Sequence, residues 1–507
     1  MSLKVRLYDT LSQRKVVLEE PVVRAYFCGP TVYDVPHLGH ARAYVVFDVL
    51  VRLLRYLGYR VVYVRNITDI DDKIIRRAQE EGVSPFEVAD RYYREFYDAM
   101  KALKVLPPNL EPRATGHIPE IIEFIKALIK KGYAYVTPDG VYFRVRKFKQ
   151  YGKLSKRSID EMKAGARVEP SPYKEDPLDF ALWKKAKPGE PSWPSPWGDG
   201  RPGWHIECSA MVLKHLGETV EIHGGGEDLI FPHHENEIAQ SEALTGKPFA
   251  KIWFHVGLLV VRGEKMAKSL KNFVTIKEAL ERFDAETIRL FLLSANRRKQ
   301  LEFSWDRVEQ AEELLDELYR ALFYAEVASK DMAHENSECS SKLANANVAE
   351  DNERIGGIKE YVSGVKLKFL EALADDLNFV EAIDVLREVA RYIIRNANKL
   401  SAVELNILAK LMRELGRILG ILQESLSERI EEKKRRGKPI ERFIPPNYAV
   451  GDSELVEQIL RLMIEVRKEL RRRKLYDLAD IIREKLKEMG IILEDIGLET
   501  RFYISRA

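Results

Sequence analysis

The fold is decided by residues 28–40, Cys28-Gly-Pro-Thr-Val-Tyr-Asp-Val-Pro-His-Leu-Gly-His40. The preceding residues 22–27 form a short apolar run of the kind that makes a buried parallel strand. Apolar residues then recur at helical spacing over 45–57, which predicts a helix that begins near His40. A second strand is expected over residues 60–66. This order predicts a βαβ unit whose helix N-terminus can face an anionic group.

Two histidines, His37 and His40, stand at the start of this predicted helix. Their imidazole groups can donate hydrogen bonds to phosphate oxygens. Gly39, which has no side chain, would let a flat ring or a sugar approach the backbone closely. The alternative is a polar helix cap beside a tight turn, and the spacing of these residues alone leaves both interpretations open.

Length and composition limit the classes of protein that the chain can form. A chain of 507 residues predicts three or four domains at about 150 residues each. The net charge of +3, from 82 basic and 79 acidic residues, means that any nucleic-acid surface must be local. Three cysteines and 32% charged residues predict a cytoplasmic protein without disulfides. No apolar run approaches the roughly 20 residues of a membrane helix, so no membrane partner is expected.

Polar residues follow the second predicted strand. Asn66, Thr68 and Asp69 lie where the carboxyl end of that strand should be, and ligands bind at such ends in open α/β sheets. The alternative is an N-cap for a helix over 72–81, and the two roles are compatible.

Four residues from separate segments suggest a metal site. His233 and Glu237 are four apart on one predicted helix and therefore share a face. Cys208 lies near another helix start, and Cys28 ends the first strand. This combination of ligands suits zinc. The alternative is a pair of ordinary buried thiols beside a polar helix start. A glycine run and further histidines favour the metal, namely Gly224–Gly226, His205 and His223.

Taken together, these segments resemble the cysteinyl-tRNA synthetases, a family of class I aminoacyl-tRNA synthetases. The similar segments are residues 27–34, 203–211, 223–229 and 231–240. His37-Leu-Gly-His40 resembles the His-Ile-Gly-His box of class I enzymes. Lys265-Met-Ala-Lys-Ser269 resembles their Lys-Met-Ser-Lys-Ser loop, with Ala267 in place of the middle serine. The similarity runs to about Asp306 and resumes in the C-terminal helices.

The resemblance implies a role for each matching residue. The implied catalytic and ATP-binding residues are His37, Gly39, His40, Lys265 and Lys268. The implied ligands of one zinc per chain are Cys28, Cys208, His233 and Glu237. The implied cysteine pocket consists of Gly29, Thr31, Thr68, Trp204 and Asp228, with Asp228 paired to the substrate ammonium. Because zinc prefers a soft thiolate to a hard hydroxyl, the metal would reject serine.

The expected architecture is a Rossmann-type parallel-sheet catalytic domain with an insertion, followed by a helical bundle and a small C-terminal RNA-binding module. The expected divisions are 1–115 and 203–260 for the halves of the catalytic fold, 116–202 for the insertion, 261–328 for the lysine-loop region, 329–357 for a polar linker, 358–432 for the helical bundle and 433–507 for an anticodon-reading module. The expected partners are tRNA(Cys), L-cysteine and ATP with magnesium, and a monomer is expected.

Two other functions are compatible with parts of the sequence. One is an ATP-dependent ligase that joins cysteine to an amino-sugar on the same core. Residues 358–507 argue against it, because a small acceptor needs no basic helical appendage. The other is a catalytically silent RNA-binding protein, which the intact histidine box and lysine loop oppose.

Overall fold

The structure is a computed structural model in which the chain forms two compact units, Met1–Pro439 and Ile440–Ala507. The residues that it describes are 3–158, 161, 171–266, 272–339, 348–397, 399–438, 440, 463–467, 469–473, 475–488, 491–496 and 499–504. Among these residues, no helix has both the length and the apolar character that crossing a membrane requires.

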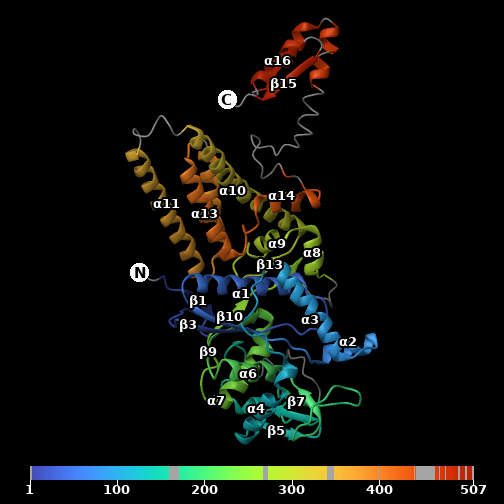
Figure 1. Ribbon diagram of the computed structural model, residues 1–507. Helices are drawn as coiled ribbons and strands as arrows, with labels where there is room; N and C mark the ends of the chain where they lie inside the picture. Colours follow the sequence, from blue (N-terminus) through green and yellow to red (C-terminus); the bar gives the residue numbers. More distant parts are fainter. Residues whose placement is uncertain are drawn as a thin grey trace. The chain divides into compact units, whose positions relative to one another are not determined.

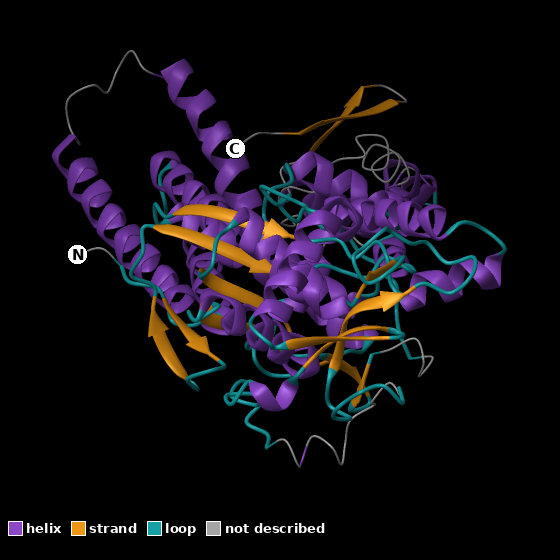
Figure 2. Cartoon of the chain, turned by 90° about the horizontal axis from the view of Figure 1, so that it is seen from below, coloured by secondary structure: helices purple, strands orange, loops and turns teal. Residues whose placement is uncertain are grey.

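The first unit is built on a parallel sheet with the strand order β10–β9–β3–β4. These strands are Val22–Phe27 (β3), Arg60–Arg65 (β4), Val220–Gly226 (β9) and Ala250–Val256 (β10). The predicted helix, α1 (Leu38–Tyr56), connects β3 to β4. The carboxyl ends of the strands meet at one edge, where Phe27 lies opposite both Arg65 and Gly224. The predicted α/β fold with a parallel sheet is confirmed (Figure 2).

Burial explains why β3 lies inside the sheet. Val23, Ala25, Tyr26 and Phe27 are all at most 1% exposed, as expected for a parallel strand that is covered on both faces. The Phe27 ring stacks on Phe47 of α1 with ring centroids 4.0 Å apart, which holds the helix against the strand.

The predicted insertion between the two halves of the sheet contains a second, antiparallel sheet with the order β5–β6–β7–β8. Its strands are Ala134–Thr137 (β5), Gly140–Phe143 (β6), Phe180–Lys185 (β7) and Gly200–Pro202 (β8). The elements around it are Asp72–Glu81 (α2), Pro85–Ala102 (α3), Ala114–His117 (η1), Ile118–Lys130 (α4) and Val145–Lys147 (η2). An N-terminal hairpin consists of Arg6–Asp9 (β1) and Arg14–Val17 (β2).

The second half of the sheet is accompanied by two helices and two short helical turns. The elements there are Trp204–His215 (α6), Glu227–Leu229 (η3), Ile230–His234 (η4) and Glu235–Thr245 (α7). A small sheet follows, made of Leu259–Val261 (β11), Glu264–Lys265 (β12) and Leu301–Glu302 (β13), with Ile276–Arg282 (α8) and Ala285–Leu292 (α9) between its strands.

A helical bundle completes the first unit (Figure 1). Its helices are Trp305–Cys339 (α10), Val348–Ala374 (α11), Phe379–Asn396 (α12), Ala402–Leu419 (α13) and Leu426–Arg435 (α14). The division at 329–357, expected to be a polar linker, stays a prediction; α10 and α11 extend into this range from both sides, and residues 340–347 lie outside the described residues.

The second unit contains a helix, Tyr476–Glu488 (α16), and a hairpin of Ile491–Ile496 (β14) and Glu499–Ile504 (β15). Its boundary at 439/440 lies close to the predicted one at 432/433. The finer divisions within the first unit stay predictions.

A buried arginine joins the parallel sheet's first helix to the helical bundle. Arg289 of α9 is fully buried and bonds Asp48 of α1 through Nη2 and Oδ2 at 2.5 Å. It also donates to the backbone carbonyls of Leu103 and Leu419 at 3.0 and 2.8 Å. Gly420 ends α13 with φ of +71°, and a Cβ there would lie 2.2 Å from the guanidinium. Three helices therefore converge on one side chain.

We expect Arg289→Met to lower the free energy of unfolding of the first unit by about 3–5 kcal/mol, because it removes the fully buried cation from the Asp48 carboxylate, which keeps only Arg52 and the Leu106 N–H, and leaves the Leu103 and Leu419 carbonyls without this donor. Urea denaturation followed by circular dichroism measures this change. The control is Lys126→Met, which breaks the exposed ion pair with Glu123 and should cost less than about 1 kcal/mol. Equal losses in the two variants would contradict the structural role of Arg289.

Candidate active site and metal centre

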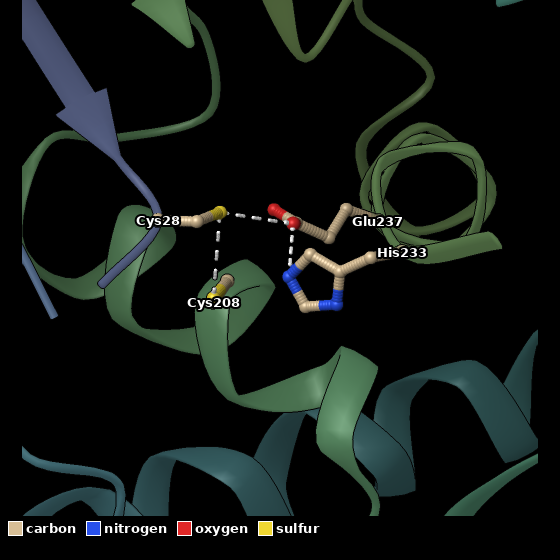
Figure 3. A group of neighbouring side chains, drawn as sticks. All are labelled: Cys28, Cys208, His233 and Glu237. Atoms are coloured by element: carbon tan, nitrogen blue, oxygen red, sulfur yellow. Dashed lines mark hydrogen bonds and ion pairs between the residues drawn. The ribbon is translucent and has the colours of Figure 1, made fainter. Parts of the chain in front are cut away.

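The four predicted metal ligands come together at the carboxyl edge of the sheet (Figure 3). Cys28 follows β3, Cys208 lies in α6, His233 lies in the turn η4 that enters α7, and Glu237 lies in the first turn of α7. One ligand atom from each residue lies within 4.8 Å of the others. His233 Nε2 is 2.7 Å from Glu237 Oε1, and the two sulfur atoms are 4.0 Å apart. This is a donor set of the composition that zinc takes in proteins.

The four residues of this cluster shift one another's pKa values. Burial works against the charge of His233, but the Glu237 carboxylate and the Cys208 sulfur together outweigh it and raise the pKa of His233 to about 10. Burial likewise opposes ionisation of Cys208, yet the hydrogen bond from the Cys28 thiol lowers the pKa of Cys208 to about 6. Burial raises the pKa of Cys28 well above its usual range. The protein by itself therefore stabilises one thiolate in this pair.

A second group of possible ligands overlaps the first. His223 and His234 join Cys28 and Glu237 in a set that meets the same 4.8 Å limit. His223 Nε2 is 3.0 Å from Glu237 Oε2, and His234 Nε2 is 3.3 Å from Cys28 Sγ. Because both groups use Cys28 and Glu237, they are alternative shells around one position.

Further aromatic rings hold the histidines in place. His205 Nδ1 lies 3.0 Å from His233 Nδ1, and the Trp204 ring stacks on His233 with centroids 4.4 Å apart. On the other side, His255 Nε2 lies 2.7 Å from His234 Nδ1. Burial lowers the pKa of both His205 and His255, so these two rings are neutral at pH 7. A neutral imidazole can orient a neighbouring ring without repelling a cation.

The predicted histidine box begins α1. His37 is the N-cap, and its Nδ1 accepts a hydrogen bond from the Gly39 N–H at 3.1 Å. His40 Nδ1 accepts from the His37 N–H at 3.3 Å, and the two rings stack with centroids 3.9 Å apart. An Nδ1 atom that accepts a backbone bond carries no hydrogen, so each neutral ring carries its hydrogen on Nε2. The helix cap and the donor role are thus compatible.

The lysine loop is attached beside this box. Lys265 ends β12, and its Nζ lies 2.7 Å from Asp228 Oδ2. The chain returns at Val274, whose carbonyl accepts from the Leu38 N–H at 3.0 Å. Lys268 and the substituted Ala267 lie outside the described residues, so their predicted roles stay predictions.

The predicted cysteine pocket gathers where β3 and β4 end. Thr31 and Thr68 form a parallel bridge, and the Thr68 N–H donates to the Pro30 carbonyl at 3.1 Å. Gly29 lies so close to β4 that a Cβ would be 1.5 Å from the Asn66 carbonyl oxygen. Trp204 lies against the metal cluster through its stack on His233. Asp228, expected to pair with the substrate ammonium, pairs with Lys265 in this structure.

Comparison with known proteins identifies the family. The profile described as "tRNA synthetases class I (C) catalytic domain" matches residues 14–313, and a DALR domain matches 368–423. The cysteine–tRNA ligase of Thermococcus gammatolerans is 47% identical over 97% of both chains. That of a Sulfurihydrogenibium species is 46% identical over 99% of both. The chain belongs to the cysteine–tRNA ligase family. Residues 368–423 of this synthetase lie in α11, α12 and α13 and the turn that follows them.

The fold of this chain is similar to the folds of other aminoacyl-tRNA synthetases whose structures have been solved. A Mycobacterium tuberculosis methionyl-tRNA synthetase bound by methionyl-adenylate has a TM-score of 0.57 at 15% identity. The matched region covers 84% of this chain and 98% of the methionyl-tRNA synthetase chain. At such low identity the likeness concerns the fold alone.

Sequence reasoning missed three buried residues of the synthetase site, His234, His255 and Glu207. Glu207 is fully buried, and its Oε2 accepts a hydrogen bond from the Thr68 hydroxyl at 2.9 Å. The sequence does carry a signal for it, because Glu207 is a charged residue inside the otherwise uncharged run Ile206–Val212 of α6. Such a residue is seldom fully buried without a partner.

Proposed function

We propose that the chain activates L-cysteine with ATP and transfers it to the 3′ end of tRNA(Cys), with a zinc ion that selects the substrate thiol. The observation that carries this proposal is the convergence of Cys28, Cys208, His233 and Glu237 at the carboxyl edge of the sheet. Family membership supports the ligase activity, and this donor set supports the choice of cysteine over other amino acids.

The chain's own residues have distinct tasks in this proposal. The carboxylate of bound cysteine attacks the α-phosphate of ATP, which gives cysteinyl-adenylate and pyrophosphate. His37 and His40 donate from Nε2 toward phosphate oxygens at the N-terminus of α1, where the helix dipole also favours negative charge. Lys265 and Lys268 follow the charge that develops on the leaving pyrophosphate, and magnesium accompanies ATP. No covalent protein intermediate is required.

The metal proposal is supported by the chemistry of the donors. Two thiols, an imidazole and a carboxylate are buried together, at 6% exposure or less. Zinc bound there supplies a soft Lewis acid that prefers a thiolate to a serine hydroxyl. Gly29, Thr31, Thr68, Trp204 and Asp228 would surround the rest of the amino acid.

The purified protein is expected to contain about one zinc per chain. Elemental analysis should find well below one zinc per chain in Cys208→Ala and in His233→Ala. The control is Cys339→Ala, whose cysteine lies at the end of α10 and whose zinc content should be undiminished. Loss of zinc from His223→Ala together with full zinc in Cys208→Ala would contradict the assigned ligands in favour of the overlapping group.

Amino-acid-dependent ATP–pyrophosphate exchange tests the function itself. Cysteine should support exchange, and serine should be worse in kcat/KM by about 10⁴-fold or more, as for sites that demand one particular polar group. A ratio near ten would show that the shape of the pocket does the sorting. Absence of any exchange with cysteine would refute the proposed function.

The small-molecule ligase remains the alternative to be tested. The DALR match in the helical bundle and the near-complete alignment with tRNA ligases both favour an RNA acceptor. In the second unit, residues 467–474 include six basic residues, which suits contact with a phosphate backbone.

A chain that ends at Pro439 lacks the second unit and retains the first. We expect it to exchange pyrophosphate with cysteine at nearly the full rate, because the metal cluster and the histidine box are intact. Charging of tRNA should collapse through weaker RNA binding. A plot of the logarithm of the tRNA-binding constant against the logarithm of the salt concentration should also become less steep. Its slope should change by about one for each phosphate that the second unit neutralises in the full chain. The double variant Arg471→Ala with Arg472→Ala removes two basic side chains of the second unit, and it should weaken tRNA charging in the same direction but by less. Unchanged charging kinetics would show that the second unit makes no contact with tRNA that matters for charging, whereas absence of tRNA charging by the full chain would favour the alternative ligase.

A further inference from the structure

Arg42, in the first turns of α1, differs from the other deeply buried arginines of the chain. Four arginine side chains of the described residues are less than 2% exposed. Three of them pair with a carboxylate, namely Arg289 with Asp48, Arg297 with Asp376 and Arg429 with Asp284. Arg42, the fourth, forms no ion pair with a carboxylate of the described residues.

The partners of Arg42 are backbone carbonyls. Its Nη1 donates to the Leu258 carbonyl at 3.0 Å, and its Nη2 donates to the carbonyls of Asn296, at 3.3 Å, and of Lys299. Its Nε has no hydrogen-bond partner among the described residues. Carbonyl dipoles solvate a guanidinium group but carry no net charge that could neutralise it. The positive charge of Arg42 is therefore uncompensated at close range.

The carboxylate that acts on Arg42 electrostatically belongs to Glu227 and acts across Leu258. Glu227 Oε1 accepts the Leu258 N–H at 3.2 Å, while Arg42 holds the carbonyl of the same residue. Burial lowers the pKa of Arg42 to about 10, so the guanidinium is still charged at pH 7. A buried charge without a paired opposite charge is costly, which favours a ligand that brings negative charge.

Arg42 lies between the two segments that the proposed function assigns to ATP. Its Cα is about 8 Å along α1 from the N-cap His37, and long helical side chains lean back toward the N-terminus of their helix. Leu258 directly precedes β11, which pairs with β12, the strand that ends at Lys265. The unpaired charge thus joins the helix of the histidine box to the small sheet that carries the lysine loop.

We propose that Arg42 is a positioning residue whose unpaired charge draws the phosphates of ATP to the N-terminus of α1. The protein supplies no paired carboxylate for Arg42, and a bound triphosphate supplies the missing negative charge. The guanidinium is enclosed by carbonyls and acts through its electric field, without touching the nucleotide. The inference rests on the proposed function, because it assumes that ATP binds at the histidine box.

Equilibrium binding to the zinc-loaded, full-length protein tests this role, with cysteine left out so that no adenylate forms. The probes are ATP with magnesium and adenosine, which has the same base and ribose but no phosphate. We expect Arg42→Met to weaken ATP binding by about 10- to 100-fold, as for one unit charge roughly 10 Å from a triphosphate at an effective dielectric constant of about 20. Adenosine binding should change by less than about threefold, because adenosine carries no charge.

Arg42→Lys keeps the charge and loses the planar fork that reaches several carbonyls. It should bind ATP within about threefold of the wild-type protein, because the field at the phosphates is retained. Arg42→Gln keeps an N–H₂ donor and lacks the charge, so it should reproduce the Arg42→Met pattern. It takes the place of Arg42→Met if that variant fails to fold.

The matched control is Arg297→Met. Arg297 is also less than 2% exposed, and it lies in the same segment as two of the carbonyls that Arg42 holds. Asp376 neutralises its charge, so its variant should leave the ratio of ATP to adenosine affinity unchanged.

Equal weakening of ATP and adenosine in the neutral variants of Arg42 would show a structural role and overturn the proposal. Unchanged ATP affinity in these variants would overturn it as well. The same holds if Arg42→Lys binds ATP as weakly as the neutral variants, or if Arg297→Met changes the affinity ratio as much as they do. Failure of the wild-type protein to bind ATP would instead refute the proposed function, and it is measured before any variant.

Discussion

The site depends on one close approach, that of Gly29 to the end of β4. No side chain fits at this position, because a Cβ would lie 1.5 Å from the Asn66 carbonyl oxygen. The contact holds this turn against the end of β4, where Gly29 bonds Asn66 and Thr31, two residues further on, pairs with Thr68. With β9 paired on the other side of β3, the metal cluster and the predicted amino-acid pocket are built on the ends of adjacent strands.

The strand, turn and helix around the histidine box could be predicted from the sequence because their signals are local. Burial of β3, the helical spacing in α1 and the N-cap at His37 agree with one another, and the structure confirms the strand and the helix. The four ligands were predicted by resemblance and by residue type, and the structure brings them within 4.8 Å.

The place of His234 beside the metal cluster could not be predicted because the local helix departs from the usual period. Residues Ile230–His234 form a π-helical turn, with Phe231 in an extended conformation. In a regular helix, neighbours such as His233 and His234 point about 100° apart and do not share a face. Here both imidazoles lie in the ligand groups around Glu237. Helical spacing links His233 to Glu237, but it cannot reveal the part played by His234.

Asp228 has a partner in the structure that the sequence does not reveal. It was expected to pair with the ammonium of cysteine, and it pairs with the ammonium of Lys265 instead. The two cations have the same charge and donor chemistry, so the pairing is consistent with an aspartate suited to an ammonium. The pair is about half exposed, and exposed ion pairs contribute only about 0–1 kcal/mol. A substrate ammonium could therefore replace Lys265 at small cost, and the same exchange would release a lysine of the loop for ATP.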